Sequence, residues 1–335
     1  MSGGVDSSVV AALLKNRGYN VIGVFMRMHK DSSSKDAKIV AQKLKIPFYV
    51  LDVQKEFKKK VVDYFINEYK KGNTPNPCVM CNKYIKFKFL IDRAIELGAD
   101  YVATGHYARL GREIRNSKSE IRKLFIASDK LKDQSYFLWQ LNQKQLGKIL
   151  FPLGDYTKEQ VRGLAKKFKL PIHSKPESQD VCFAVPRRSF QAKVGNIVTI
   201  DGKIVGKHNG IEFYTIGQRK GLEIGGIGPA RHGKPGVAGG PFYVVKKDFK
   251  RNALIVSRNE KDLMQKELTV KDLNFLTGKP YNGKCKIKIR STGKVADATI
   301  KGNKVIFKQS QRAIASGQSA VIYLKDELIG GGIIK

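Results

Sequence analysis

Composition and charge limit what this chain of 335 residues can be. It is long enough for two or three domains with cores of their own, and it has neither a signal peptide nor an apolar run of about 18 residues, so we expect a cytoplasmic protein without a membrane partner. Its 63 Lys and Arg against 29 Asp and Glu give a net charge of +34, which argues for a polyanionic partner, RNA or DNA, unless the whole proteome is rich in lysine.

The first motif lies at the very start of the chain. Ser2–Ser8 reads Ser-Gly-Gly-Val-Asp-Ser-Ser and runs into the apolar stretch Val9–Leu14, which we expect to be helical. Two glycines allow a tight turn that brings backbone N–H groups close to an anion, and the helix N-terminus adds partial positive charge. No Gly-Lys-Ser/Thr follows, so this is not a Walker loop. We interpret it as a pyrophosphate cradle; the alternative is an ordinary Gly-Ser turn that caps a helix.

This loop resembles that of the ATP pyrophosphatase (PP-loop) superfamily, whose members cleave ATP between the α and β phosphates and adenylate an oxygen. The resemblance implies an ATP site at Met1, Ser2, Gly3, Gly4, Val5, Asp6, Ser7 and Ser8. Asp6 is the candidate for holding Mg²⁺ and pyrophosphate. Such a loop usually follows a buried parallel strand, for which there is no room before Met1. We expect the natural start to lie upstream; the alternative is that the first strand is absent.

Strands and helices then alternate, which favours an α/β fold with a parallel sheet. The expected strands are Tyr19–Met26, Phe48–Val53 and Ala99–Thr104, and the expected helices are Asp36–Leu44 and Glu56–Lys71. Ligands of such sheets bind at the carboxyl ends of the strands. Met26 and Gly105 lie at two of these ends, where they could contact an adenine, although packing or turn geometry also explains them.

Two cysteines lie in the proline-containing segment Thr74–Lys83, before a helix that we expect to begin near Tyr84. A thiol at the start of a helix and beside lysines should have a lowered pKa and be a better nucleophile. Lys83, Lys86 and Lys88 would form a basic rim suited to phosphates. The spacing Cys78-x-x-Cys81 by itself fits a redox pair, half a metal site or neither.

In the rest of the chain, the predicted secondary structure changes from helices to short β-strands. In Lys132–Trp139 the aromatic residues should be core and the polar residues exposed, and a basic amphipathic helix is expected at Tyr156–Leu170. Cys182 ends a polar loop, where burial and reactivity are equally plausible. From Gly195 onward, short β-branched runs between glycine turns indicate a small barrel or sandwich. We expect a catalytic PP-loop domain at 1–189, a small central domain at 190–262 and a C-terminal β-barrel at 263–335.

Several motifs in order resemble the tRNA-specific 2-thiouridylases. The motifs are Ser2–Ser8, Thr74–Lys83 with Ile85–Phe87, Gly105–Arg109, Lys132–Leu138, Gln179–Phe183, Thr215–Leu222, Gly317–Val321 and Gly330–Gly332. They cover essentially the whole chain. The resemblance implies an enzyme that uses ATP and Mg²⁺ to adenylate the C2 oxygen of the wobble uridine in tRNA and then replaces that oxygen by sulfur.

The resemblance also implies roles for single residues. Cys182 would carry a persulfide, delivered by a cysteine desulfurase or a sulfur-relay carrier protein, and Cys81 would be the second thiol, which closes a disulfide as the product leaves. The target base must leave its stack to reach the site, and the residues that would meet it are Asn76, Pro77 and Cys78. The residues that would contact tRNA are His106, Lys132, Asp133, Gln134, Arg290, Ser291 and Gln318.

This sequence departs from the family pattern at two places. Many members carry Asp where Cys78 stands, so an acid/base role is lost or reassigned there, and Cys78, Cys81 and Cys182 could instead ligate a [4Fe–4S] cluster. Arg290-Ser291 stands where an Arg-aromatic pair is common, which puts stacking in doubt. Cys285, in an expected barrel strand, fits packing better than chemistry.

Three other functions stay open on the sequence alone. Another adenylating PP-loop enzyme, such as an amidotransferase synthetase or lysidine synthetase, would not need Cys81 and Cys182. A non-enzymatic RNA-binding protein would not need Asp6. Nucleic-acid binding by charge alone would show steep salt dependence without preference for tRNA.

Overall fold

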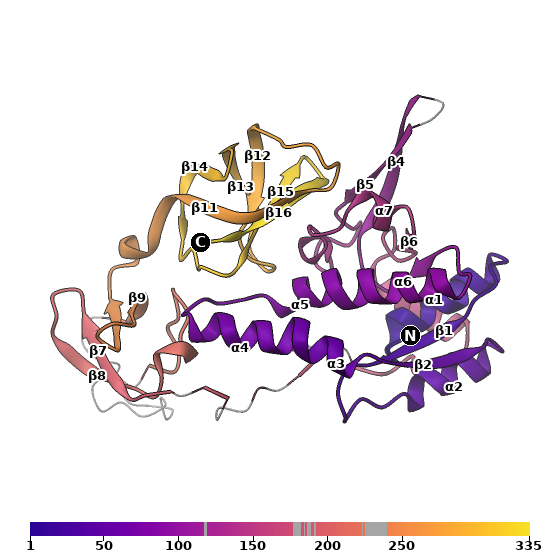
Figure 1. The fold of residues 1–335 in the computed structure, drawn as a ribbon, viewed down its shortest axis with the longest axis horizontal. Coiled ribbons are helices and arrows are strands. Elements are labelled where there is room, and N and C mark those ends of the chain that lie inside the picture. The colour runs from indigo at the N-terminus through magenta and orange to yellow at the C-terminus, as the bar shows by residue number, and fades with distance from the viewer. Residues whose placement is uncertain are drawn as a thin grey trace.

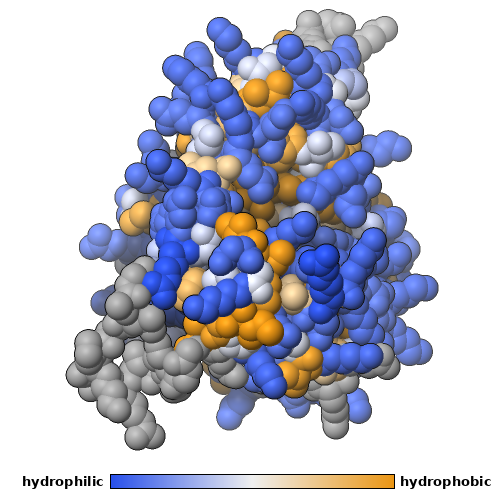
Figure 2. Space-filling view, turned by 90° about the vertical axis from the view of Figure 1, so that its left-hand side faces the viewer, coloured by the Kyte–Doolittle hydropathy of each residue, from blue (hydrophilic) through white to orange (hydrophobic). Residues whose placement is uncertain are grey.

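The computed structural model describes residues 1–116, 119–176, 182–183, 185, 189–190, 192–222, 224 and 240–335. Three regions follow one another: an α/β region, a small central sheet and a C-terminal barrel (Figure 1). This is the predicted fold class. In the described part of the chain, no helix is long and apolar enough to cross a membrane. The face in Figure 2 is covered mainly by hydrophilic side chains, with smaller apolar patches between them.

The α/β region contains two short pairs of parallel strands. β1 (Gly23–Arg27) pairs with β2 (Phe48–Asp52), and β3 (Val102–Ala103) pairs with β6 (Ile149–Leu150). The helices are α1 (Val5–Asn16), α2 (Lys35–Lys43), α3 (Gln54–Phe57), α4 (Asp63–Lys70), α5 (Pro77–Met80), α6 (Leu90–Glu96), α7 (Gln143–Leu146) and α8 (Lys158–Lys167). Two π-helical segments, η1 (Lys58–Val62) and η2 (Cys81–Phe89), make α3–α4 and α5–α6 continuous helical stretches.

The helix that carries the first two cysteines begins earlier than predicted. It starts at Pro77 rather than near Tyr84, because the Asn76 side chain caps it by accepting from the backbone N of Cys78 at 3.1 Å. Proline is favoured at the first helical position, where its missing N–H costs nothing. Cys78 and Cys81 therefore both lie within the helical stretch, and Cys81 begins its π-helical segment.

The central region is a four-stranded sheet in the order β8-β7-β10-β9. Its strands are β7 (Gly195–Thr199), β8 (Ile204–His208), β9 (Tyr243–Asp248) and β10 (Ala253–Ser257), and a 3-10 turn, η5 (Ile211–Phe213), follows β8. Ile197, Val244 and Leu254 are buried in its small core.

The C-terminal region is a closed antiparallel barrel of six strands, joined to the central sheet by η6 (Glu260–Leu263). The strands are β11 (Met264–Phe275), β12 (Gly283–Lys288), β13 (Ala296–Lys301), β14 (Lys304–Arg312), β15 (Ser319–Leu324) and β16 (Glu327–Ile334). Pairing of β11 with β16 closes it. The hairpin of β4 (Arg109–Asn116) and β5 (Ser119–Phe125) extends this sheet, because β5 pairs with β16. Cys285 packs in the barrel core.

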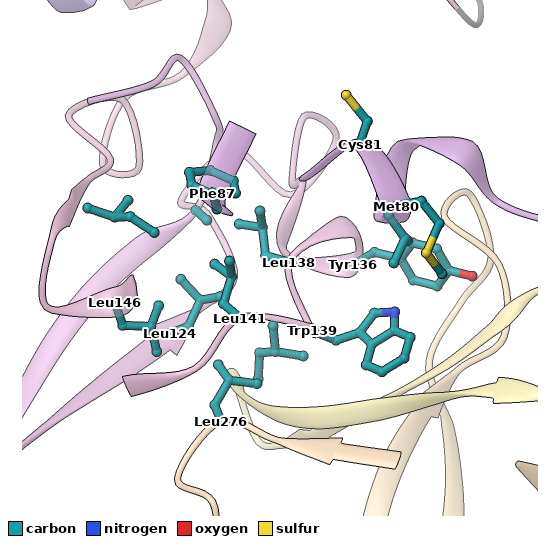
Figure 3. Close-up of a cluster of buried hydrophobic side chains, with 14 of the residues drawn as sticks. Met80, Cys81, Phe87, Leu124, Tyr136, Leu138, Trp139, Leu141, Leu146 and Leu276 are labelled. Atoms are coloured by element: carbon teal, nitrogen blue, oxygen red, sulfur yellow. The ribbon is translucent and has the colours of Figure 1, made fainter. Parts of the chain in front are cut away.

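The barrel and the α/β region share one hydrophobic core (Figure 3). Trp139, which follows the 3-10 turn η3 (Ser135–Phe137), is fully buried against the barrel, and its Nε1 donates to Ser319 Oγ at 3.0 Å. A Cβ on Gly331 would lie 2.9 Å from the Trp139 ring, so this close approach requires glycine. Tyr136 and Trp139 of the 132–139 motif are core, as predicted, and Phe137 packs against the same cluster while partly buried.

Candidate active site

The Ser2–Ser8 loop closes on itself through its own side chains. Gly3 adopts φ +77°, and a Cβ there would lie 3.1 Å from Asp36 Cβ, so the loop needs glycine at this position. Ser7 Oγ and Ser8 Oγ donate to the Gly4 carbonyl at 3.2 and 2.9 Å, and Ser2 N donates to Ser7 Oγ at 3.0 Å. Ser8 is fully buried, so its hydroxyl serves the loop rather than a ligand.

Gly105 packs directly on this loop, and its contact with ATP stays a prediction. A Cβ on Gly105 would lie 3.0 Å from Asp6 Cβ and 3.1 Å from the backbone N of Ser7. Met26 lies half-buried near the carboxyl end of β1, and Met1 lies beside the same strand, with its terminal nitrogen donating to the Val24 carbonyl.

Asp6 is paired with residues that are distant in sequence. Its Oδ1 accepts from Lys158 Nζ at 2.6 Å and from the Tyr107 hydroxyl at 3.0 Å. The Asp6 side chain is 33 % exposed. A carboxylate suits Mg²⁺, which is commonly held by one or two carboxylates together with substrate phosphates. Asp6 therefore fits the predicted metal role, with Lys158 as the cation that now balances its charge.

A second site, which we call the thiol centre, consists of Cys78, Cys81, Cys182 and Lys86. Cys81 is 7 % exposed, whereas Cys78 and Cys182 are exposed. The charge of a Cys182 thiolate would raise the pKa of both other thiols, and Lys86 lowers the pKa of all three, so the structure brings the four side chains into one neighbourhood. Phe183 anchors the Cys182 segment, with its ring centroid 5.6 Å from that of Phe57. Gln179, Asp180 and Val181, from the same motif, lie outside the described residues.

The predicted lowering of the thiol pKa is wrong. Loss of hydration raises the pKa of the buried Cys81 to about 11. It also raises the pKa of Cys78 and Cys182, whose sulfur atoms are packed among protein atoms although both residues keep exposed surface. Lys86 opposes this shift only in part, because loss of hydration penalises a thiolate more than one nearby cation stabilises it. All three thiols are therefore mostly protonated at neutral pH.

The alternative that Cys78, Cys81 and Cys182 ligate a [4Fe–4S] cluster stays a prediction. Among the described residues, which include all three cysteines, no group of three His, Cys, Asp or Glu side chains is arranged to hold a metal ion. We therefore derive no step through a cluster.

The segment that leads to Asn76, Pro77 and Cys78 is held by contacts of Thr74 with the barrel and the central region. We call the contacts of Thr74 with Ser316, Gln318 and Thr215 the clamp. Thr74 N donates to the Ser316 carbonyl and Gln318 Nε2 donates to the Thr74 carbonyl, both at 2.7 Å. Thr74 Oγ1 also lies 3.3 Å from Thr215 Oγ1. A Cβ on Gly317 would lie 2.9 Å from both Asn73 Cβ and Thr74 N. A cavity of about 400 Å³ at this junction, away from the Ser2–Ser8 loop, is lined by residues that include Asn73, Thr74, Ile216, Lys247 and Ser316.

The residues predicted to contact tRNA do not form one exposed patch. Burial lowers the pKa of His106 well below its ordinary value, and its Nδ1 lies 2.7 Å from Thr104 Oγ1. The expectation that 132–134 are exposed is wrong, since all three residues are half-buried. Asp133 accepts from Ala127 N and Ser135 Oγ, while Gln134 Oε1 accepts from Tyr107 N.

The barrel residues of the predicted tRNA contact set lie elsewhere. Arg290 is half-buried and donates to the Ala313 carbonyl, Ser291 follows it, and Gln318 belongs to the clamp.

Comparison with known proteins extends over the whole chain. Family models match in three consecutive parts: a tRNA methyl transferase HUP domain at 1–186, a tRNA methyl transferase PRC-barrel domain at 187–258 and an aminomethyltransferase beta-barrel domain at 265–334. A tRNA-specific 2-thiouridylase MnmA 2 of Clostridium botulinum (strain Loch Maree / Type A3) is 44% identical over 360 residues, covering 100% of this chain and 97% of the relative. The chain belongs to the tRNA-specific 2-thiouridylase family.

Other members support the same assignment. The family member from Clostridioides difficile (strain 630) is 43% identical over 364 residues and the MnmA 2 from Thermoanaerobacter sp. (strain X514) is 44% identical over 367 residues, each covering 100% of this chain and 96% of the relative.

A solved structure described as a predicted subunit of tRNA methyltransferase from Methanocaldococcus jannaschii matches 49% of this chain and 72% of that chain, at 22% identity and a TM-score of 0.32.

Sequence reasoning missed three residues of this 2-thiouridylase-family site. Tyr107 and Lys158 bind Asp6, and Lys175 Nζ donates to the Gly3 carbonyl at 3.2 Å. Tyr107 could have been found as part of the Gly105–Arg109 motif. Lys158 and Lys175 are two of many lysines in a basic segment, so only the fold singles them out.

Proposed function

We propose that this protein is an ATP-dependent tRNA-uridine 2-sulfurtransferase that replaces the C2 oxygen of the wobble uridine by sulfur. The observation that carries the proposal is that Cys182 shares one neighbourhood with Cys78, Cys81 and Lys86, although it lies far from them in sequence. The full-length similarity to named 2-thiouridylases supports tRNA as the substrate. Because that substrate is tRNA, we also infer that the enzyme works in the cytoplasm.

The first step is adenylation. The C2 oxygen of the uracil attacks the α-phosphorus of ATP, the bond to the β-phosphate breaks and pyrophosphate leaves. The N–H groups of the Ser2–Ser8 loop and the N-terminus of α1 would bind the phosphates, while Met26 and Gly105 would border the adenine. Mg²⁺, when bound, would neutralise charge on the phosphates, and Asp6 is the residue that would hold it. Adenylation converts the C2 oxygen into a leaving group.

The second step transfers sulfur. The terminal sulfur of a persulfide on Cys182 attacks C2, and AMP leaves. Cys81, as a thiolate, then attacks the Cys182 sulfur, which releases 2-thiouridine and forms a Cys81–Cys182 disulfide. An external dithiol, or two equivalents of a monothiol, reduces the disulfide to two thiols and is itself oxidised to a disulfide. A cysteine desulfurase or sulfur-relay carrier then reloads Cys182. The high pKa of Cys81 suits a resolving thiol that stays protonated until it is needed.

Binding of tRNA would bring the flipped base to Asn76, Pro77 and Cys78. We assign contacts with the rest of the tRNA to Lys132, Arg290 and Ser291, and to Gln318 through the clamp. The side chains of His106, Asp133 and Gln134 form hydrogen bonds within the protein. They would therefore position the neighbouring residues that contact tRNA. We also propose domain boundaries at 1–189, 190–262 and 263–335, supported by the three family models.

The test is a thiolation assay with metal-depleted protein, ATP, Mg²⁺, a cysteine desulfurase with cysteine, and unmodified tRNA, followed by nucleoside analysis. The proposal expects 2-thiouridine from the wild type and from Cys285→Ala, but not from Cys182→Ser. Adenylation that leaves AMP on the RNA without sulfur would instead indicate another PP-loop activity. Thiolation that requires added iron would contradict the persulfide route.

A further inference from the structure

A lysine lies against the Ser2–Ser8 loop although the loop contains no basic residue of its own. Lys158 Nζ is 2.6 Å from Asp6 Oδ1 and 5.7 Å from the centre of the Tyr107 ring. The Lys158 side chain is only 12 % exposed, so its ammonium group is directed into the site rather than into solvent.

The position of Lys158 is determined by several independent contacts. It is the first residue of α8, where Thr157 and Gln160 form a reciprocal capping box. Its backbone N donates to Asp129 Oδ2 at 2.9 Å. Val161 and Ala165 of the same helix pack with α1 in one buried cluster. The helix that carries the lysine is thus packed on the helix that carries the loop.

A second lysine, Lys175, contacts the same loop at Gly3. Lys175 Nζ donates to the Gly3 carbonyl at 3.2 Å and to Asp36 Oδ2 at 2.5 Å. Gly3 itself packs on Asp36, as its missing Cβ shows. Both lysines are therefore held by a carboxylate at the loop, and both could exchange that carboxylate for a phosphate.

We propose that Lys158 and Lys175 bind the phosphate chain of ATP, and that Asp6 holds Lys158 in the absence of nucleotide. When ATP binds, Lys158 moves its hydrogen bond from Asp6 to a phosphate oxygen, which leaves the Asp6 carboxylate available to Mg²⁺. No covalent bond changes in this exchange. The exchange improves charge balance, because the loop itself offers only backbone N–H groups and hydroxyls to a polyanion and has no basic side chain. This inference rests on the proposed use of ATP.

The test measures nucleotide affinity directly, by isothermal titration calorimetry with ATP and, separately, with inorganic pyrophosphate. Lys158→Met keeps the apolar stem and removes the charge, and Lys166→Met, an exposed lysine of the same helix, is the matched control. We expect Lys158→Met to weaken ATP and pyrophosphate binding about 10- to 100-fold, the worth of a charged hydrogen bond. Its tRNA affinity and melting temperature should match the control, and Lys158→Arg should recover part of the loss.

A second variant tests the exchange between Asp6 and phosphate. Asp6→Asn should bind ATP without Mg²⁺ at least as tightly as the wild type, because Lys158 is no longer held by a carboxylate, and it should lose the gain that Mg²⁺ provides. Equal ATP affinity in Lys158→Met and Lys166→Met, in a wild type that binds ATP and makes thiouridine, would overturn the inference and leave the function intact. A wild type that binds no ATP would overturn both.

Discussion

The Ser2–Ser8 loop and the thiol centre are assembled in opposite ways. The loop is closed by hydrogen bonds among residues at most five positions apart, and its shape depends on Gly3 and on hydroxyls next to it in the chain. The thiol centre combines the segment of Cys78 and Cys81 with Cys182, about a hundred residues later in the chain. Thr74, which leads into the first of these, is bonded to Ser316 and Gln318 of the barrel and faces Thr215 of the central region.

Because the two sites are built from different contacts, mutations should separate the two half-reactions. Changes in the barrel should disturb sulfur transfer while leaving nucleotide binding intact, because no barrel residue contributes to the closure of the Ser2–Ser8 loop described above. Changes at Lys158 should do the reverse.

Removal of the sulfur-carrying thiol should have the largest effect. Cys182→Ser should lower thiouridine formation by roughly 1,000-fold or more, since loss of a nucleophile that acts as part of a unit costs at least this much. ATP affinity, measured by calorimetry, should stay within about twofold of the wild type. Cys285→Ala, which removes a thiol buried in the barrel core, is the control, and equal thiolation in both variants would contradict the role of Cys182.

Raising the pH should accelerate release of thiouridine in a single turnover. A thiol with a pKa of about 11, as burial gives Cys81, is mostly protonated at pH 7, so its thiolate fraction rises about tenfold per pH unit well below that pKa. Between pH 7 and pH 9 we expect an increase of roughly 100-fold in the release step, with ATP affinity almost unchanged. A flat profile measured by rapid quench would show that Cys81 is not the resolving thiolate.

Filling the contact between Gly317 of the barrel and the Asn73–Thr74 segment should have an intermediate effect. Gly317→Ala places a Cβ 2.9 Å from Asn73 and Thr74 and forces alanine into φ +90°, so we expect a loss of about 1–3 kcal/mol in unfolding free energy and reduced thiolation. Gly302→Ala is the matched control, because Gly302 also has positive φ but open space around it. Urea unfolding and the thiolation assay measure both, and a loss of ATP affinity in Gly317→Ala would argue against the separation.

Removing a single hydrogen bond of the clamp should have the smallest effect. Gln318→Ala deletes the bond from Nε2 to the Thr74 carbonyl, worth about 1 kcal/mol, and should slow thiolation about fivefold. If Gln318 acts through Thr74 rather than on tRNA alone, Thr74→Val, which removes the hydroxyl facing Thr215, should reduce the rate without changing tRNA affinity. Unchanged kcat with weaker tRNA binding in both variants would reassign Gln318 to direct contact.

Much of this protein was determined by sequence acting locally. Ser2, Ser7 and Ser8 specify the closure of the loop locally, because their hydrogen bonds are with residues at most five positions away. Apolar runs predicted β1 and β2 within a few residues, and short β-branched runs between glycine turns predicted the β structure of the C-terminal part. The start of α5 was missed because Pro77 and the Asn76 cap outweigh the helical pattern that begins later. The aromatic core around Trp139 followed from hydrophobicity alone.

The tertiary structure decided what depends on burial and on distant partners. Burial reversed the expected shift of the thiol pKa values, since desolvation depends on everything packed around Cys81. Burial also places His106, predicted to contact tRNA, inside the protein and lowers its pKa. Lys158 is one of many lysines in the sequence, and only the packing of α8 on α1 places its charge at Asp6. Sequence determined which chemical groups are present; the fold decided which are charged and which meet.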